Sequence, residues 1–205
     1  MSIPPPAARS VARFEITLAV LLGAAALASA GSAYLGNSDD GNQLKYLEHS
    51  SQTRAGANDA YAAGDQQLAL DQTIFIEYAN AHYEGDDELA AYFGNDLSPT
   101  LNKAITAWKK DNTAVTPFSG DRPIYHPAGY TDGDQLDAQA DKQFAKADFY
   151  DARGDDFVLA TVVFAGALGL LGIGGVLSRW RNKLLFAGAG TAALVGGLVF
   201  VGMTL

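Results

Sequence analysis

Long runs of apolar residues stand near the two ends of the chain, and polar residues fill the segment between them. The runs cover residues 14–35, 156–177 and 184–205, and their only charges are Glu15 and Asp156 at the leading edges of the first two. A helix needs about 20 apolar residues to cross a bilayer, and in hydrocarbon a helix satisfies its own backbone hydrogen bonds. The pattern therefore predicts three transmembrane helices.

The first apolar run has a second interpretation, as a cleaved signal peptide. Arg9 and Arg13 precede it, and the small residues at 28–30 or 31–33 are typical of a cleavage site. The run continues to Leu35, beyond both of these sites, which favours a retained helix. Both interpretations send the segment that follows across the membrane.

The segment between the first and second runs has the spacing of helices and almost no strand pattern. Five of its residues follow one seven-residue repeat, namely Leu47, Tyr61, Leu68, Phe75 and His82. The absence of proline predicts one helix over residues 42–84, about 65 Å long, or two helices divided at Gly64 and Asp65. Residues 37–41, which are rich in Asn, Asp and Gly, predict a break after the first span.

Turn and cap signals predict shorter helices farther along this insert. Gly85, followed by three acids, is typical of a helix end and of the acidic first turn of the next helix. Ser98 and Pro99 are typical of a cap and a first turn, and predict a helix to about Lys110. Prolines and glycines predict a loop over residues 111–131. Helical spacing then resumes and runs into the second span, so we expect this helix to pack antiparallel to the one leaving the first span.

The expected fold class is an all-α membrane protein with three transmembrane helices and an α-helical hairpin or bundle inserted between the first and the second. The expected divisions are a cytoplasmic N-terminus (1–13), transmembrane helix 1 (14–35), an acidic helical extracytoplasmic domain (36–155), transmembrane helix 2 (156–177), a cytoplasmic loop (178–183) and transmembrane helix 3 (184–205).

The sign of the charge changes along the chain and predicts its orientation. The 205 residues include 14 Lys and Arg against 23 Asp and Glu, a net charge of −9. Residues 36–156 contain 9 of the bases and 22 of the acids, a net charge of −13, whereas the remainder carries +4. Basic residues favour the cytoplasmic side of a membrane. We therefore expect a multi-pass protein of a bacterial-type cytoplasmic membrane, with its N-terminus inside and its C-terminus outside.

The composition argues against several kinds of chemistry. Without cysteine, the chain has no disulfide, thiol nucleophile or cysteine-held metal. Its histidines, His49, His82 and His126, lack the spacing of a metal site. The acidic charge disfavours contact with nucleic-acid phosphates. We therefore expect no cofactor, no metal, no catalytic residue and no nucleic-acid partner.

Asp71 is the most interesting polar residue of the insert, because it lies on the apolar side of the predicted helix. A buried carboxylate needs a partner, for which Arg54, Lys142 and Lys146 are candidates, or must stay neutral. His82 is the second candidate for a buried polar residue, on the same side of that helix.

The spans contain ridges of small residues and, inside them, no ionisable group that would relay protons or ions. Small residues spaced four apart allow two helices to approach closely. The candidate contact residues are Ala165 and Gly169 in the second span and Gly188, Ala192, Gly196, Ala193 and Gly197 in the third. They predict packing within the chain or between copies of it.

Four segments resemble a family of small, functionally uncharacterised bacterial membrane proteins with one N-terminal span, a helical extracytoplasmic insertion and a C-terminal two-span hairpin. They are Ser32-Ala33-Tyr34, Leu68-Ala69-Leu70-Asp71-Gln72 with Phe75 and Glu77-Tyr78, Trp108, and the run from Asp156 to Ala165. The resemblance implies this architecture over most of the chain, and no activity. A continuous helix after the first span belongs to it, and Gly56 and Gly64 depart from that expectation.

We therefore expect a non-enzymatic integral membrane protein whose insert serves as a scaffold or accessory subunit. Its expected partners are the lipid bilayer and either further copies of itself or another membrane or extracytoplasmic protein. The alternative is an oligomeric channel or a component of a small-solute transporter. A third hypothesis, an extracytoplasmic hydrolase, requires Asp71 and the histidines to converge in one cleft.

Overall fold

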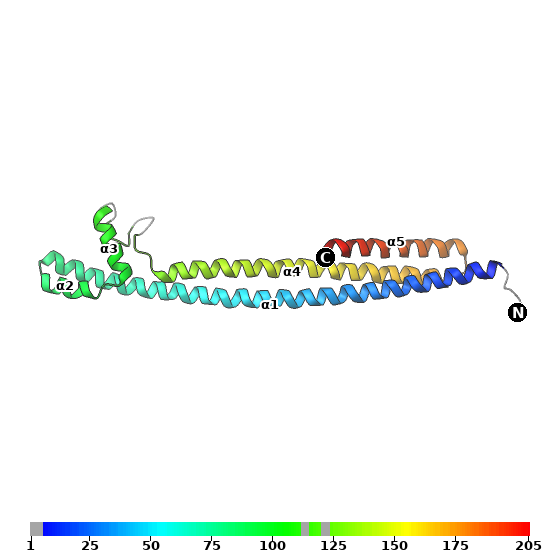
Figure 1. The fold of residues 1–205 in the computed structure, drawn as a ribbon, viewed down its shortest axis with the longest axis horizontal. Coiled ribbons are helices and arrows are strands. Elements are labelled where there is room, and N and C mark those ends of the chain that lie inside the picture. Colours follow the sequence, from blue (N-terminus) through cyan, green and yellow to red (C-terminus); the bar gives the residue numbers. More distant parts are fainter. Residues whose placement is uncertain (1–5, 112–114, 120–123) are drawn as a thin grey trace. The chain divides into compact units, whose positions relative to one another are not determined.

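The computed structural model describes residues 6–111, 115–119 and 124–205, and the described residues form five α-helices and no strand. The helices are α1 (Pro6–Glu84), α2 (Asp87–Asn95), α3 (Pro99–Asp111), α4 (Ala128–Val176) and α5 (Trp180–Thr204), labelled in Figure 1. Residues 1–5 of the expected N-terminal segment, and Gly120 and Pro123 of the expected loop, lie outside the described residues. The all-α class is confirmed.

Three of the helices, α1, α4 and α5, are long and apolar enough to cross a membrane, as the apolar runs predict. Two of them continue far beyond their apolar parts, since α1 has 79 residues and α4 has 49. Helix α5 begins at Trp180, four residues before the predicted span 184–205, and so includes Arg181 and Lys183. The connection from α4 to α5 is therefore only residues 177–179.

The first helix is unbroken, and this corrects one prediction and decides another. The expected break at residues 37–41 is absent, and residues 42–84 form a single helix. Asp39 does not cap a helix, because its carboxylate is bonded to Arg153 on α4. Gly64 does not end one either, because it provides room for the ring of Tyr130. In both places the residue that suggested a break serves a contact between helices.

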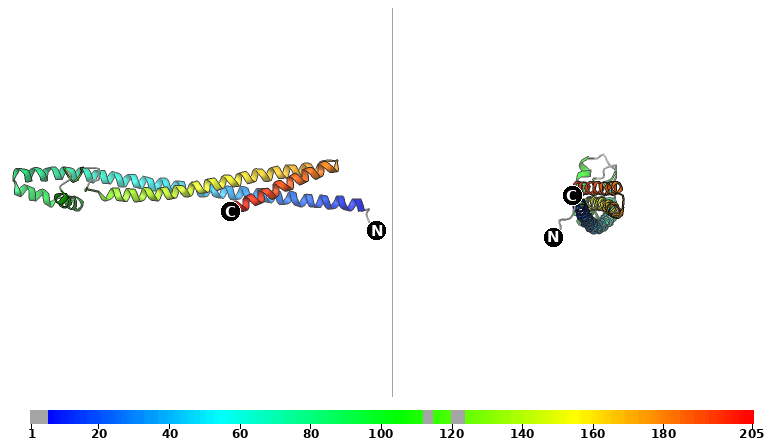
Figure 2. Two further views of the ribbon diagram at one scale, coloured as in Figure 1. Left: turned by 90° about the horizontal axis from the view of Figure 1, so that it is seen from above. Right: turned by 90° about the vertical axis from the view of Figure 1, so that its right-hand side faces the viewer.

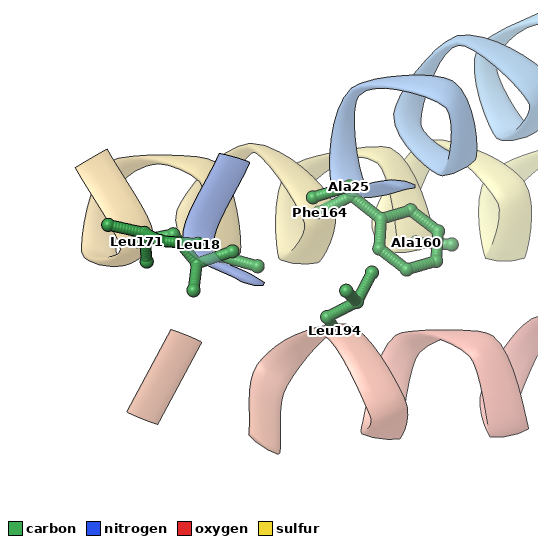
Figure 3. Close-up of a cluster of buried hydrophobic side chains, with 7 residues drawn as sticks. Leu18, Ala25, Ala160, Phe164, Leu171 and Leu194 are labelled. Carbon is green, nitrogen blue, oxygen red and sulfur yellow. The ribbon is translucent and has the colours of Figure 1, made fainter. Parts of the chain in front are cut away.

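The chain divides into two compact units, which are described separately. Unit 1 consists of Met1–Leu47 and Phe144–Leu205 and holds the three apolar segments, whereas unit 2 is Glu48–Gln143. In unit 1 the apolar parts of α1, α4 and α5 lie side by side (Figures 1 and 2). Their shared core contains Leu18, Ala25, Ala160, Phe164, Ala167, Leu171 and Leu194. Figure 3 shows Leu18 beside Leu171, and Leu194 of α5 reaching toward Phe164 of α4.

Unit 2 combines a helix pair, formed by parts of α1 and α4, with the short helices α2 and α3. Gly85 ends α1 with a φ of 77°, which glycine adopts without strain, and the Asp86 amide donates to the Ala81 carbonyl at 3.0 Å. Asp86 then caps α2 by accepting from the Leu89 amide at 2.9 Å. Ser98 caps α3 in the same way, at 3.0 Å from the Leu101 amide. The cap and turn signals at Gly85 and Ser98 are thus confirmed.

The packed side of α1 in unit 2 is displaced from the predicted repeat. The buried residues of this part of α1 are Ser50, Ala57, Gly64, Asp71, Phe75 and Ala81. The first four are again seven apart but lie three positions beyond the predicted repeat, of which Phe75 is the buried member. Ser50 donates to the carbonyl of Ala140 on α4 at 2.9 Å, and Gly64 lies against Gly129 of α4. Small residues occupy the centre of the contact between α1 and α4 because they let two helices approach closely. The larger aromatic side chains lie beside this contact.

Candidate functional site

Asp71 is the most deeply buried charged residue that the structure describes, with 1% of its surface exposed. Its Oδ2 accepts hydrogen bonds from the Ser98 hydroxyl and the Tyr125 hydroxyl, each at 2.6 Å. Its Oδ1 accepts one from Gln67 Nε2 at 3.0 Å. Hydrogen bonds to a charged acceptor are short and strong. One carboxylate therefore joins α1, the start of α3 and the described part of the loop before α4.

The predicted partners of Asp71 are wrong, because none of the three bases lies at the carboxylate. Arg54 instead pairs with Asp141 on α4 at 2.7 Å, and both side chains are largely exposed. In unit 1, Lys146 lies over the ring of Tyr46. Along an unbroken α1, Arg54 is about 25 Å from Asp71 at 1.5 Å per residue. Neutral hydroxyl and amide donors satisfy the buried carboxylate in place of a cation.

The core around Asp71 is apolar and aromatic. Phe75, Leu101, Ala104, Ile105 and Tyr125 are its buried members, and Trp108 and Phe118 pack against it. Burial, together with the hydrogen bond to Asp71, raises the pKa of Tyr125 above its ordinary value. Tyr125 therefore stays protonated and donates to Asp71 at neutral pH. With three donors on its oxygens and no exposed edge, this carboxylate is built to hold elements together.

A second polar constellation joins α1 to α4 within unit 2. Tyr61 of α1 donates to Asp134 of α4 at 2.8 Å, and Tyr130 of α4 donates to Asp65 of α1 at 2.6 Å. These bonds raise the pKa of Tyr61 to about 12 and raise that of Tyr130 as well. Each helix therefore supplies one tyrosine donor and one carboxylate acceptor to the other.

Glycines provide the space for this tyrosine pair. A Cβ on Gly64 would lie 2.6 Å from the ring of Tyr130, and a Cβ on Gly133 would lie 2.6 Å from the ring of Tyr61. The sequence signal for this pair is a repeated motif that the hydropathy pattern does not reveal. Tyr-x-x-Gly-Asp occurs at residues 61–65 and again at residues 130–134. In each copy of the motif, the tyrosine donates a hydrogen bond to the aspartate of the other copy, on the neighbouring antiparallel helix.

Unit 1 has its own polar contact between α1 and α4. Arg153 binds Asp39 through two nitrogens, each 2.7 Å from a carboxylate oxygen, and Asp39 is almost fully buried. The bond to Asp39 raises the pKa of Arg153. Gln43 donates to Asp151 nearby, at 2.6 Å. Arg153 lies in the turn of α4 that comes just before its apolar part. The spacing of residues in the sequence does not predict this ion pair.

The histidines do not converge with Asp71. His82 is exposed, against the prediction that it is buried, and stacks on Tyr78 with ring centroids 6.1 Å apart. The reason is the displaced packing side of α1, which buries Ala81 in its place. Along α1, His49 lies about 50 Å from His82. No group of three metal-ligating side chains occurs among the described residues.

The predicted ridges of small residues divide between the inside and the outside of unit 1. Gly197 is buried, and a Cβ there would lie 2.6 Å from the Phe164 ring, while Ala193 packs against the core. The others are exposed, namely Ala165, Gly169, Gly188, Ala192 and Gly196. Gly190, which the spacing did not select, is a further contact, since its Cβ position lies 2.7 Å from Leu171.

Comparison with known proteins gives no match, whether with a family model, a curated protein or a solved structure. The resemblance to small bacterial membrane proteins with a helical insertion therefore stays a prediction from the sequence.

Proposed function

We propose that this chain is a non-enzymatic integral membrane protein that acts as a scaffold or accessory subunit, with residues 36–155 as an extracytoplasmic interaction domain. In this proposal α1, α4 and α5 cross a bacterial-type cytoplasmic membrane, with the N-terminus inside and the C-terminus outside. The charge difference between the insert and the flanking segments supports this direction. The three apolar helices support membrane insertion.

The observation that carries the proposal is that the buried polar residues of unit 2 hold its helices together, while large aromatic residues remain exposed on its surface. Its buried carboxylate accepts hydrogen bonds from three donors, and its tyrosine–aspartate pairs connect α1 to α4. Large side chains remain on the surface near α2: Tyr83 is 93% exposed and Tyr92 is 63% exposed. Tyrosine is enriched in protein interfaces because it combines a large apolar ring with a polar group. A rigid support that presents such side chains is suited to binding another protein.

Crosslinking in native membranes tests the proposal. The full chain is crosslinked, extracted in mild detergent and analysed by mass spectrometry, and a discrete complex with a second protein or a second copy is expected. A matched sample of Tyr83→Ser/Tyr92→Ser is expected to lose partner recovery while it retains the helical content of the unaltered chain. Recovery of monomer alone, under conditions that capture a known membrane complex, contradicts the proposal.

One observation favours a second candidate, an oligomeric channel or small-solute transporter component. The outward ridge of Gly188, Ala192 and Gly196 on α5 is available for contact between copies or for lining a passage between them. Reconstituted vesicles distinguish this candidate from a scaffold. A flux of ions or small solutes above that of empty vesicles supports a channel, whereas equal flux removes it.

A further inference from the structure

One face of α3 is basic and hollowed. Exposed residues along it line a hollow of about 500 Å³, and they are Pro99, Asn102, Lys103, Thr106, Ala107 and Lys110. An adjoining hollow of about 390 Å³ shares Lys103 and Ala107 and extends to His126. The two ion pairs of the described residues involve other bases, so Lys103 and Lys110 have no acidic partner in this part of the chain. We call this surface the lysine face.

The start of α2 forms a hollow of the opposite charge. Asp86, Glu88, Leu89 and Tyr92 line its volume of about 340 Å³. Leu89 is 41% exposed and Tyr92 is 63% exposed, so the hollow combines carboxylates with an accessible apolar surface. Glu88 forms no ion pair with any described residue. We call this surface the acidic hollow.

The sequence shows how unusual the lysine face is. Residues 55–102 contain nine acids and neither lysine nor arginine, whereas residues 103–110 contain three lysines and no acid. The lysine face is thus a locally basic surface within a segment, residues 36–156, whose net charge is −13. Complementary charge selects partners and penalises the juxtaposition of like charges. A surface with the matching charge and an aromatic side chain exists on the same molecule, at the acidic hollow.

We propose that the lysine face of one copy of this chain binds the acidic hollow of a second copy, with Tyr92 entering beside Ala107 between Lys103 and Lys110. This inference rests on the proposed function and names its partner. Each copy carries both surfaces, so a twofold dimer makes the contact twice. An aromatic side chain that enters a hollow flanked by paired charges is the usual anchor of an interface. Copies that share one membrane meet at a high effective concentration, so a small contact suffices.

Cysteine crosslinking tests this contact cleanly, because the chain has no cysteine. Full-length Ala107→Cys and Leu89→Cys, with different tags, are reconstituted together in vesicles of zwitterionic lipid and oxidised. A disulfide between the two tags is expected, in higher yield than the disulfide that either variant forms with itself. The matched control pairs Ala107→Cys with Leu70→Cys, whose side chain is more exposed than that of Leu89 and lies outside both surfaces. Equal yields for the two pairs overturn the inference.

Charge reversal provides the second arm. Lys103→Glu/Lys110→Glu in the Ala107→Cys copy is expected to remove the disulfide to the Leu89→Cys copy, and Glu88→Lys in the latter, at a residue of the acidic hollow, is expected to restore it in part. The control Lys45→Glu/Lys142→Glu makes the same change of charge at exposed lysines elsewhere and is expected to leave the yield unchanged. Helical content is measured for every variant. A disulfide that persists after the first reversal, or that the second does not restore, overturns the inference.

Failure of this inference is distinguishable from failure of the proposed function. If crosslinking in native membranes recovers another protein while no disulfide forms between copies, the contact between the lysine face and the acidic hollow is wrong and the proposed scaffold function stands. If neither appears, both are wrong.

Discussion

At the residue scale, the structure replaces an expected ion pair with hydrogen bonds from neutral groups. A buried carboxylate is costly unless it is hydrogen-bonded, and Asp71 meets this requirement with Ser98, Tyr125 and Gln67. Ser98 also caps α3, so the same hydroxyl donates to Asp71 and accepts from the Leu101 amide. Loss of one donor should therefore loosen several elements of unit 2 together.

Tyr125→Phe isolates this effect, because it removes one hydroxyl and keeps the ring. We expect the free energy of unfolding of unit 2 to fall by about 1.5–3 kcal/mol, the range for a hydrogen bond to a charged group. Thermal unfolding followed by Trp108 fluorescence, in a Trp180→Phe background, measures it, since Trp108 packs on Phe75. Tyr92→Phe, at an exposed ring, is the control and should change stability by less than about 0.5 kcal/mol. An equal effect of the two changes contradicts the role of Asp71.

The tyrosine–aspartate pairs predict sensitivity to alkali. The hydrogen bond to Asp134 raises the folded-state pKa of Tyr61 to about 12, and that to Asp65 raises the pKa of Tyr130. Below about pH 10, the ordinary tyrosine pKa, both rings are protonated in the folded and unfolded chains, and the stabilisation is complete. As the pH rises from 10 towards 12 the unfolded chain releases these protons first, so stability falls. The urea midpoint of unit 2 should therefore change less between pH 9 and pH 11 in Tyr61→Phe/Tyr130→Phe than in the unaltered chain. An equal change in both proteins contradicts the role of the tyrosine–aspartate pairs in stability.

At the scale of elements, some glycines inside the helices mark places where two helices touch. Helix interiors normally disfavour glycine by about 1 kcal/mol relative to alanine. At Gly64, Gly133 and Gly197 a side chain of the neighbouring helix fills the place where a Cβ would lie. At Gly41 and Gly196 no atom lies within 4 Å of that place. Only the packed glycines should resist replacement by alanine.

Adjacent glycines in α5 give a matched test of this distinction. Gly197→Ala should destabilise unit 1 by about 1–3 kcal/mol, because the added methyl overpacks against Phe164. Gly196→Ala should be neutral or stabilising, because its Cβ points into open space and alanine favours the helix. Thermal unfolding in detergent, followed by circular dichroism, measures both. Equal losses for the two variants would show that both faces of α5 are packed.

The outward ridge supports a separate prediction about contact between copies. If Gly188, Ala192 and Gly196 lie at a contact in the bilayer, Gly196→Ile should lower the fraction of crosslinked oligomer without lowering the stability of the monomer. If lipid covers the ridge, neither quantity changes. Crosslinking yield and thermal stability, measured on the same detergent sample, separate these outcomes.

At the scale of the whole molecule, charge and hydropathy together specify the expected arrangement in the membrane. Residues 36–156 carry −13 and the rest of the chain carries +4, and basic residues near the spans favour the cytoplasmic side, which is the basis of the proposed orientation. Leu70→Cys, at an exposed position of α1 in unit 2, should react with a membrane-impermeant maleimide in intact cells. Ser178→Cys, in the connection between α4 and α5, should react only after permeabilisation. The reverse labelling pattern would show that the orientation is inverted.

The sequence by itself determined the all-α class, the three apolar helices and the ends of α2 and α3, because these depend on local patterns of hydropathy and on caps a few residues long. Tertiary structure alone decided which seven-residue repeat of α1 is packed, that α1 runs unbroken past Gly64, and that Asp71 bonds to Ser98 and Tyr125. A repeat read along one helix does not say which side a second helix takes; that choice depends on how closely the two backbones approach, and small residues permit the closest approach. For the same reason the predicted repeat wrongly places His82 in the core and does not predict the reciprocal tyrosine–aspartate bonds.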